Sequence, residues 1–281
     1  MSDIHERIEA WLKAHEKPEI HIDYAKPEAP IPVGASKIGG CPDVPAGFVW
    51  PRYKDRFGVV DAARKDMERP LSFMAQFDLA EVAAFDKEGA LPKSGHVAFF
   101  FDYEGFYDGG MCDQGGARVF YFPPGTALER MALPDDMGED ADIPELALTF
   151  STRTSRPVSN DWPEELLGDT EPDDDEYEKH NKAESGCKLL GYPFTIQNPM
   201  QDECQVAFMD VDWDALENPE TKAAMEAGMN DWVLLFQFDS IDVDDYADIM
   251  FGDCGALYFW IRKQDLAAGN FGKVYACQQF Y

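Results

Sequence analysis

Basic residues are scarce in this chain. Its 24 Lys and Arg residues stand against 54 Asp and Glu residues, which gives a formal net charge of −30 over 281 residues. Binding to nucleic acid through phosphate neutralisation requires a surplus of Lys and Arg, and so does binding to an anionic membrane surface. The composition therefore disfavours both nucleic acid and membrane as partners.

Long apolar runs are absent as well. No run reaches the roughly 18 residues of a transmembrane helix, and the first residues, MSDIHERIEAW, lack the basic region and apolar region of a secretory signal. We therefore expect a cytoplasmic protein that does not span a membrane.

Recognised catalytic and metal-binding motifs are missing too. The sequence contains no C-x-x-C, H-E-x-x-H, G-x-S-x-G or Walker pattern. Asp210–Asp214 has the D-x-D-x-D opening of a calcium loop, but Ala215 replaces its glycine and Thr221 replaces its final glutamate. Cys112 with His96 as its base is the remaining pair for covalent catalysis, although the spacing gives no reason for them to meet. We therefore predict no cofactor and no metal site.

The residues that are present favour a folded, core-containing protein. Apolar residues make up 45% and aromatic residues 13% of the chain, which is enough for a substantial core. Ile4, Ile8 and Leu12 recur at helical spacing, which predicts an N-terminal helix within residues 1–17. The proline-rich stretch 18–32 that follows is expected to be a connector.

Four short blocks occur twice, in the same order. The pairs are Lys37–Pro42 with Lys188–Pro193 (both K-x-x-G-x-P), Leu71–Asp78 with Trp232–Asp239 (both ending in Gln-Phe-Asp), Gly95–Phe99 with Gly255–Phe259, and Arg118–Phe120 with Lys273–Tyr275. This ordered set predicts an internal duplication. We expect an α+β fold, sheet-rich and mostly antiparallel, with two pseudo-symmetric lobes, residues 33–125 and 185–281. An acidic connecting segment, 126–184, joins them into one structural unit spanning 1–281.

Apolar patterns locate the individual elements. Strands are predicted at 71–78, 96–101, 118–122, 146–150, 205–209, 232–238, 256–261 and 273–281. The runs 96–101 and 256–261 are apolar on both faces, which is typical of central strands. Asn218-Pro219 predicts an N-cap and the start of a helix that Gly228 ends. The dense negative charge predicts a mobile surface stretch at 160–184.

The duplicated blocks also supply the candidate site. Its six residues are Lys37, Gln76 and Asp78 from the first copy and Lys188, Gln237 and Asp239 from the second. If a pseudo-twofold axis relates the lobes, the two Gln-Phe-Asp strand ends face one cleft. There the carboxylates would act as an acid/base pair or bind a cation, and the lysines would hold an anion. The alternative is structural: Gln and Asp satisfy backbone groups at strand ends, and each Lys pairs with a local carboxylate.

The same blocks carry a resemblance to a known family. SKIGGCPDVPAGFVWP (36–51), RPLSFMAQFDLAEV (69–82), LPKSGHVAFFFD (91–102), KLLGYP (188–193) and the tail 234–281 look like the YwqG-like family of bacterial proteins. The resemblance runs from about residue 33 to the end of the chain. It implies a sheet-rich α+β unit, brings no catalytic residue, and connects the chain loosely with proteins that accompany or neutralise toxins.

Two functional hypotheses follow. The first is an acidic protein-binding module that engages a basic protein partner, for example a toxin that it neutralises, with association accelerated by electrostatic steering. The second is a small-ligand-binding protein or hydrolase-like enzyme with a cleft between the lobes, lined by the six residues. The absence of a recognised catalytic constellation favours the first, and whether the chain is an enzyme stays open.

Overall fold

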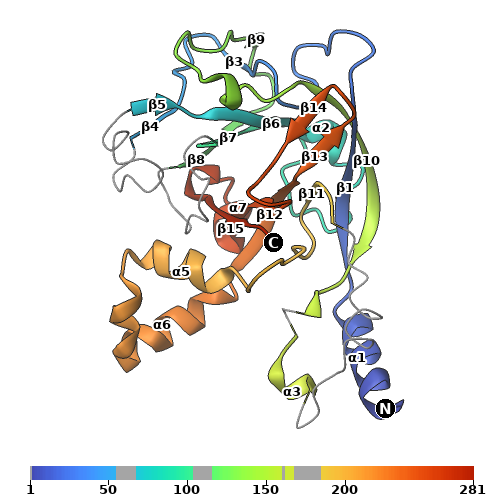
Figure 1. The fold of residues 1–281 in the computed structure, drawn as a ribbon, viewed down its shortest axis with the longest axis vertical. Coiled ribbons are helices and arrows are strands. Elements are labelled where there is room, and N and C mark those ends of the chain that lie inside the picture. Colours follow the sequence, from blue (N-terminus) through green and yellow to red (C-terminus); the bar gives the residue numbers. More distant parts are fainter. Residues whose placement is uncertain (1, 55–67, 104–115, 160–161, 168–184) are drawn as a thin grey trace.

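The computed structural model describes residues 2–54, 68–103, 116–159, 162–167 and 185–281 (Figure 1). One ten-stranded sheet organises them. In spatial order its strands are β16 (Tyr275–Gln279), β15 (Ala256–Arg262), β12 (Trp232–Asp239), β11 (Lys188–Leu189), β1 (Lys17–Ala25), β10 (Leu146–Ser155), β2 (Lys37–Ile38), β6 (Ser72–Asp78), β7 (His96–Phe101) and β8 (Ala117–Phe122). Every neighbouring pair is antiparallel, which confirms the predicted sheet-rich, mostly antiparallel α+β class.

The strand order is symmetric about the centre of the sheet: on each side a short strand comes first, followed by three longer strands in sequence order. β1 and β10 form the central pair, β2-β6-β7-β8 follow on one side, and β11-β12-β15-β16 follow on the other. Lys37 pairs with Gln76 on one side and Lys188 pairs with Gln237 on the other. The two halves of the sheet therefore share strand order and local register, while descent from a duplicated module remains a prediction.

The central strand β1 corrects one expectation. The stretch 18–32 was expected to be a connector, yet residues Lys17–Ala25 pair along their whole length with β10. Ile20 and Ile22 alternate with polar residues and are buried, so a period of two outweighs the single Pro18 near the start of the strand. The predicted strand 146–150 is confirmed, and β10 extends it to Ser155.

The sheet curls until its inner faces meet. Phe77 of β6 lies 5.2 Å from Phe236 of β12, and Phe99 of β7 lies 5.0 Å from Phe259 of β15, measured between ring centroids. One apolar cluster fills this interior. Separate clusters cover the outer faces of the two halves, around Phe100 in the first and Trp260 in the second. β7 and β15 are thus buried on both faces, as their continuously apolar sequences predict.

Short ribbons and helices surround the sheet. The ribbons are β3 (Asp43–Pro45) with β9 (Leu128–Arg130), β4 (Arg52–Lys54) with β5 (Glu68–Pro70), and β13 (Ile241–Val243) with β14 (Ala247–Ile249). The α-helices are α1 (Ser2–Ala14), α2 (Leu79–Val82), α3 (Glu164–Leu167), α5 (Gln201–Met209), α6 (Pro219–Met229) and α7 (Lys263–Ala267), and the 3-10 turns are η1 (Glu139–Ala141), η3 (Trp213–Glu217) and η4 (Phe271–Lys273). None of these helices is both long enough and apolar enough to cross a bilayer.

Two helices are informative about the sequence patterns. The strand predicted at 205–209 is wrong, because these residues belong to α5: Met200 and Cys204 are buried at helical spacing against the outer face of the second half. The helix predicted after Asn218 is confirmed as α6, with the Asn218 side chain accepting the Glu220 amide at 2.9 Å. It passes Gly228 and ends at Met229.

The N-terminal helix packs apart from the main core. Ile4, Ile8 and Leu12 of α1 form a small cluster with Trp162 and Leu166 of the segment that contains α3. The apolar stripe predicted from the sequence therefore contacts a helix from the acidic segment. The predicted mobile stretch 160–184 lies almost entirely outside the described residues.

Candidate functional site

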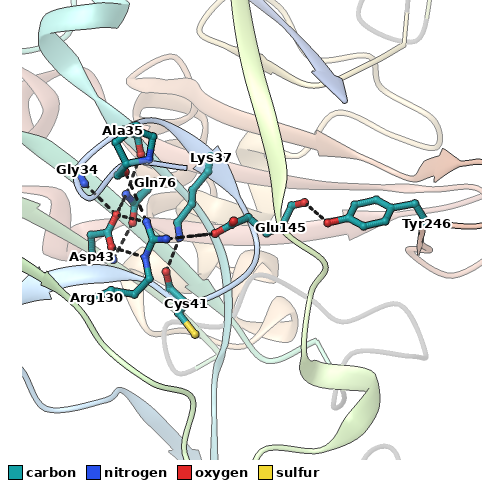
Figure 2. Close-up of polar contacts among 10 residues, drawn as sticks. Gly34, Ala35, Lys37, Cys41, Asp43, Gln76, Arg130, Glu145 and Tyr246 are labelled. Carbon is teal, nitrogen blue, oxygen red and sulfur yellow. Dashed lines mark hydrogen bonds and ion pairs between the residues drawn. The ribbon is translucent and has the colours of Figure 1, made fainter. Parts of the chain in front are cut away.

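A buried polar network occupies the junction of β2, β6 and β10 (Figure 2). The Lys37 side chain is fully buried, and its Nζ lies 2.9 Å from Glu145 Oε2 and also donates to the Cys41 carbonyl. Gln76 accepts the Asp43 amide at 2.8 Å and donates to the Ala35 carbonyl at 2.8 Å. Lysine charge and glutamine amide are thus both satisfied by the surrounding protein, as buried polar groups require.

Asp43 and Arg130 complete this network. The Asp43 carboxylate is buried and accepts Arg130 Nε at 2.9 Å and the Gly34 amide at 2.9 Å. Burial opposes ionisation of Asp43, but the hydrogen bonds from Arg130, Gly34 and Gln76 outweigh it and lower the pKa of the carboxyl. The arrangement therefore keeps Asp43 charged and fixes the loop 34–44 on the sheet.

The second half of the sheet holds a smaller version of the network. Lys188 Nζ lies 2.9 Å from Glu19 Oε2, and both side chains are almost completely buried. Gln237 accepts the Phe194 amide at 2.8 Å and donates to the Gly186 carbonyl at 3.1 Å. Each lysine of the repeated K-x-x-G-x-P block is therefore neutralised by a glutamate on a central strand or at its start.

Sequence reasoning missed Glu19 and Glu145. They precede Ile20, which pairs with Leu189, and Leu146, which pairs with Ile38. The equivalence of the two glutamates becomes visible only through this register, because neither lies within a repeated block. The one signal available in the sequence was an acidic residue directly before an apolar strand residue at two places, Glu19-Ile20 and Glu145-Leu146.

The two repeated aspartates end their strands in different surroundings. Asp78 Oδ1 accepts the Ala80 amide at 2.9 Å and thereby caps α2. Asp239 accepts the Ser240 amide at 2.9 Å. Burial raises the pKa of the Asp239 carboxyl, and the hydrogen bonds that it accepts only partly offset this.

The structure brings the six predicted residues into two groups. Lys37 is the register partner of Gln76, and Lys188 is the register partner of Gln237. β1 and β10 lie between the two groups in the sheet. A binding role for Lys37, Gln76, Asp78, Lys188, Gln237 and Asp239 remains a prediction.

Two of the pockets on the described part of the molecule bear on the predicted site. One, of about 410 Å³, is lined by Asp78 and His96 together with Val33 and Leu128. The other, of about 720 Å³, lies between residues 88–92 of the first half and α7 of the second. Cys112 lies outside the described residues, so its predicted pairing with His96 is not tested.

Metal ligands do not gather in the described residues. No group of three His, Cys, Asp or Glu side chains there has the arrangement that could hold a metal ion. Asp210, Asp212 and Asp214 of the calcium-like sequence are exposed, before and within η3, and they form no such group. The described residues therefore offer no assembled metal centre.

One acidic surface of the described residues is a helical projection. Residues 201–230, which we call the acidic arm, comprise α5, η3 and α6, and Figure 1 shows this pair of helices extending from one side of the sheet. The arm carries one basic residue, Lys222, and eight acidic residues: Asp202, Glu203, Asp210, Asp212, Asp214, Glu217, Glu220 and Glu226. Trp213 stands among them and is 43% exposed, whereas Trp50, Trp162, Trp232 and Trp260 are buried.

The base of the acidic arm already binds a guanidinium group. Arg262 Cζ lies 4.4 Å from the centroid of the Phe208 ring of α5, and Arg262 also pairs with Asp231 at 2.9 Å. An aromatic face together with a carboxylate is a favourable site for an arginine side chain. Trp213, flanked by Asp212 and Asp214, presents the same two kinds of group to solvent.

Comparison with known proteins gives a family without a described activity. The model of a domain of unknown function, DUF1963, matches residues 36–279. This match is compatible with the resemblance to YwqG-like proteins but does not name that family. A search of curated proteins finds no match.

Proposed function

This chain belongs to the DUF1963 family of domains of unknown function, and we propose from its own residues that it is a binding protein that engages a basic protein partner through the acidic arm. The observation that carries the proposal is Trp213, the most exposed tryptophan, surrounded by carboxylates on a projecting pair of helices. Tryptophan is enriched among residues that dominate binding energy at protein interfaces. A basic toxin that the protein neutralises is one partner of this kind.

The charge distribution supports a basic partner. Within the acidic arm the single ion pair in the described contacts is Lys222 with Glu226 at 3.9 Å, and both side chains are largely exposed. The other carboxylates of the arm leave a strongly negative surface. Such a surface accelerates the approach of a basic protein and makes association sensitive to salt.

The position of the lysines supports the same choice. Lys37 and Lys188, which the cleft hypothesis assigns to an anion, are buried and paired with Glu145 and Glu19. Releasing Lys188 for a ligand would leave the buried carboxylate of Glu19 without its partner, which is costly, and releasing Lys37 would break its ion pair with the partly exposed Glu145. Binding at the exposed acidic arm requires no such rearrangement.

A basic peptide tests the acidic arm directly. We expect a fluorescein-labelled Arg-Ala repeat peptide to bind at low salt, measured by its fluorescence anisotropy, and to be released at high salt. Trp213→Ala should weaken binding about 30-fold or more, the effect of an interface hot spot. The double change Asp212→Asn, Asp214→Asn should weaken it about two- to fivefold for each exposed charge.

The matched control removes equal charge elsewhere. Asp242 and Asp244 lie exposed in the β13–β14 ribbon, so the double change Asp242→Asn, Asp244→Asn reduces the net negative charge of the protein by the same amount. If this control weakens binding as much as the arm variant, binding is non-specific and the assignment to the arm is wrong. A salt-eluted pull-down then identifies the natural basic partner, and recovery of none at low salt would sink the proposal.

We also propose that the two halves of the sheet descend from one duplicated module. Beyond the matching strand order, each half has an irregularity in register at the same place, between Phe73 and Ala75 in β6 and between Leu234 and Phe236 in β12. The two central strands are exchanged between the halves: β1, which precedes the first half in sequence, pairs with β11 of the second half, and β10, which precedes the second half, pairs with β2 of the first. A strand-by-strand superposition of 33–125 on 185–281 that matched no strand would refute common descent.

The second candidate remains a small-ligand site or hydrolase-like activity between the lobes. It is favoured by the pocket of about 720 Å³, which has walls from both halves. Neither Asp78 nor Asp239 lines this pocket, and Asp78 lines the smaller one of about 410 Å³. If the two aspartates nevertheless carry a ligand-binding role, Asp78→Asn and Asp239→Asn should abolish ligand binding while leaving the unfolding midpoint unchanged. A large loss of stability instead would assign both residues to the fold.

A further inference from the structure

The larger pocket is lined by buried apolar residues, which we call its floor, and by half-buried or exposed charged residues, which we call its mouth. Leu91, Leu190, Leu234 and Leu266 line it and are buried, and Tyr121 and Val233 complete its apolar wall. Its volume of about 720 Å³ falls within the range of small-molecule sites, which are mostly apolar concavities with a few charged groups. We call it the Leu190 pocket.

Leu190 is held in a strained backbone conformation. Its φ is 61°, in the left-handed region that non-glycine residues avoid. The equivalent residue of the first K-x-x-G-x-P block is Gly39, with a φ of 58°. The second block therefore keeps a leucine where the first has the unstrained glycine, and this leucine forms part of the pocket floor. Strain of this kind concentrates at functional sites.

The equivalent turn of the first half is closed. The Gly40 amide donates to the Ile143 carbonyl at 2.7 Å, and a Cβ added to Gly39 would clash with the Pro144 carbonyl oxygen. Ile20 and Leu146 hold equivalent positions, because Ile20 pairs with Leu189 and Leu146 pairs with Ile38. Lys17 stands three residues before Ile20, and Ile143 stands three residues before Leu146, so Lys17 is the equivalent of Ile143. The position that seals the first turn is thus occupied in the second by Lys17, which lines the open pocket.

Charged side chains at the mouth indicate the ligand. Lys17 and Lys263 line the pocket, in a chain that has only 24 basic residues. Lys263 Nζ donates to the Asn230 carbonyl at 2.8 Å, while its neighbour Asp231 forms its ion pair with Arg262 at 2.9 Å. Lys17 Nζ lies 3.7 Å from the centroid of the Tyr192 ring. Glu88 is the acidic residue among the lining residues.

We propose that the Leu190 pocket binds a small organic anion with an apolar tail, of the class of a medium-chain monocarboxylate. The tail lies on the leucine floor, where apolar contact is favourable, and the carboxylate meets the ammonium groups of Lys17 and Lys263. This inference rests on the second candidate function, because the Leu190 pocket is the pocket between the two halves, and it names the ligand class of that site. It does not depend on the acidic arm binding a basic partner, since none of the residues that line the pocket belongs to residues 201–230.

Octanoate and octylammonium, titrated by calorimetry into the full-length protein, test the sign of the charge. We expect saturable binding of octanoate in the millimolar range or tighter and much weaker binding of octylammonium. Absence of octanoate binding, or equal binding of both probes, would overturn the proposal, because the net charge of −30 by itself favours the cation.

Filling the pocket tests its location. Ala267 lines the pocket and is exposed on α7, so Ala267→Trp adds an indole ring without entering the core. We expect it to abolish octanoate binding, whereas Ala227→Trp on the exposed face of α6, the matched control, should leave binding unchanged. Binding that survives Ala267→Trp with native circular dichroism would place octanoate elsewhere and refute the assignment.

Charge changes at the mouth give a second measurement that does not depend on Ala267→Trp. Lys263→Gln should weaken octanoate binding about two- to fivefold, and Glu88→Gln should strengthen it by a similar factor, the range of exposed ion pairs. Lys222→Gln on α6 removes the same charge from a distant exposed site and should change nothing. Equal effects of Lys263→Gln and Lys222→Gln, or none from either mouth variant, would contradict a bound anion there.

Discussion

The buried pair Lys188–Glu19 provides the sharpest quantitative test of how this fold is held together. The pair joins residues on β11 and β1, and the exposed fractions of the side chains are 4% and 8%. Removing one partner of such a pair leaves an uncompensated buried charge and costs about 3–5 kcal/mol. Glu19→Gln retains shape and one acceptor, so we expect a loss of about 3 kcal/mol, and Lys188→Met should cost a similar amount.

The double variant separates this pair from its surroundings. With Glu19→Gln and Lys188→Met combined, no buried charge is left unpaired, so the loss should be smaller than the sum of the single changes, with a coupling of about 0.5–3 kcal/mol. Urea unfolding followed by tryptophan fluorescence gives each free energy. A loss of about 3 kcal/mol corresponds to a midpoint shift of about 1 M in urea.

Lys37–Glu145 serves as the internal comparison. Glu145 is 25% exposed and also lies 3.8 Å from Arg130, so it keeps water and a second cation when Lys37 is removed. Lys37→Met should therefore destabilise the protein less than Lys188→Met. Additive effects in the Glu19–Lys188 cycle, or a loss below about 1 kcal/mol for Glu19→Gln, would refute the claim that the buried charge dominates.

Two further predictions concern the same junction of β2, β6 and β10. Because the folded pKa of Asp43 lies below its unfolded value, its ionised form stabilises the protein above about pH 4, and this contribution is lost as pH falls through the folded value. Asp43→Asn should therefore lower stability at pH 7 and flatten the acid limb of a stability-versus-pH curve. Gly39→Ala combines a positive φ with a clash against the Pro144 carbonyl and should cost more than about 3 kcal/mol. Gly47 also has a positive φ but open space around it, so Gly47→Ala should cost about 1 kcal/mol. Thermal unfolding of both variants measures the difference.

The sequence was most informative where the physical signal is local. The run HVAFFF predicts a strand buried on both faces, and β7 is one. Asn218 followed by Pro219 predicts a helix start, and α6 begins there with the expected cap. Each of these features depends on residues within a few positions of one another, so its pattern is present in the linear sequence.

It was least informative where packing overrides a short pattern. Residues 205–209 fit a strand in isolation, but burial of Cys204 against the second half of the sheet selects a helix. Lys17–Ala25 contains a proline and follows a helix closely, yet pairing with both β10 and β11 makes it a central strand. The partners that decide these cases are far away in sequence.

By itself the sequence determined the apolar strands that recur in the two halves, the repeated Lys and Gln positions, and the excess of negative charge. Only the tertiary structure decided what neutralises the lysines, that β1 and β10 meet at the centre, and that one of two equivalent turns opens into the Leu190 pocket. The reason is separation: Lys37 finds Glu145 across 108 positions and Lys188 finds Glu19 across 169. Which of 54 acidic residues pairs with each lysine is set by strand register, and register is fixed only when the whole sheet assembles.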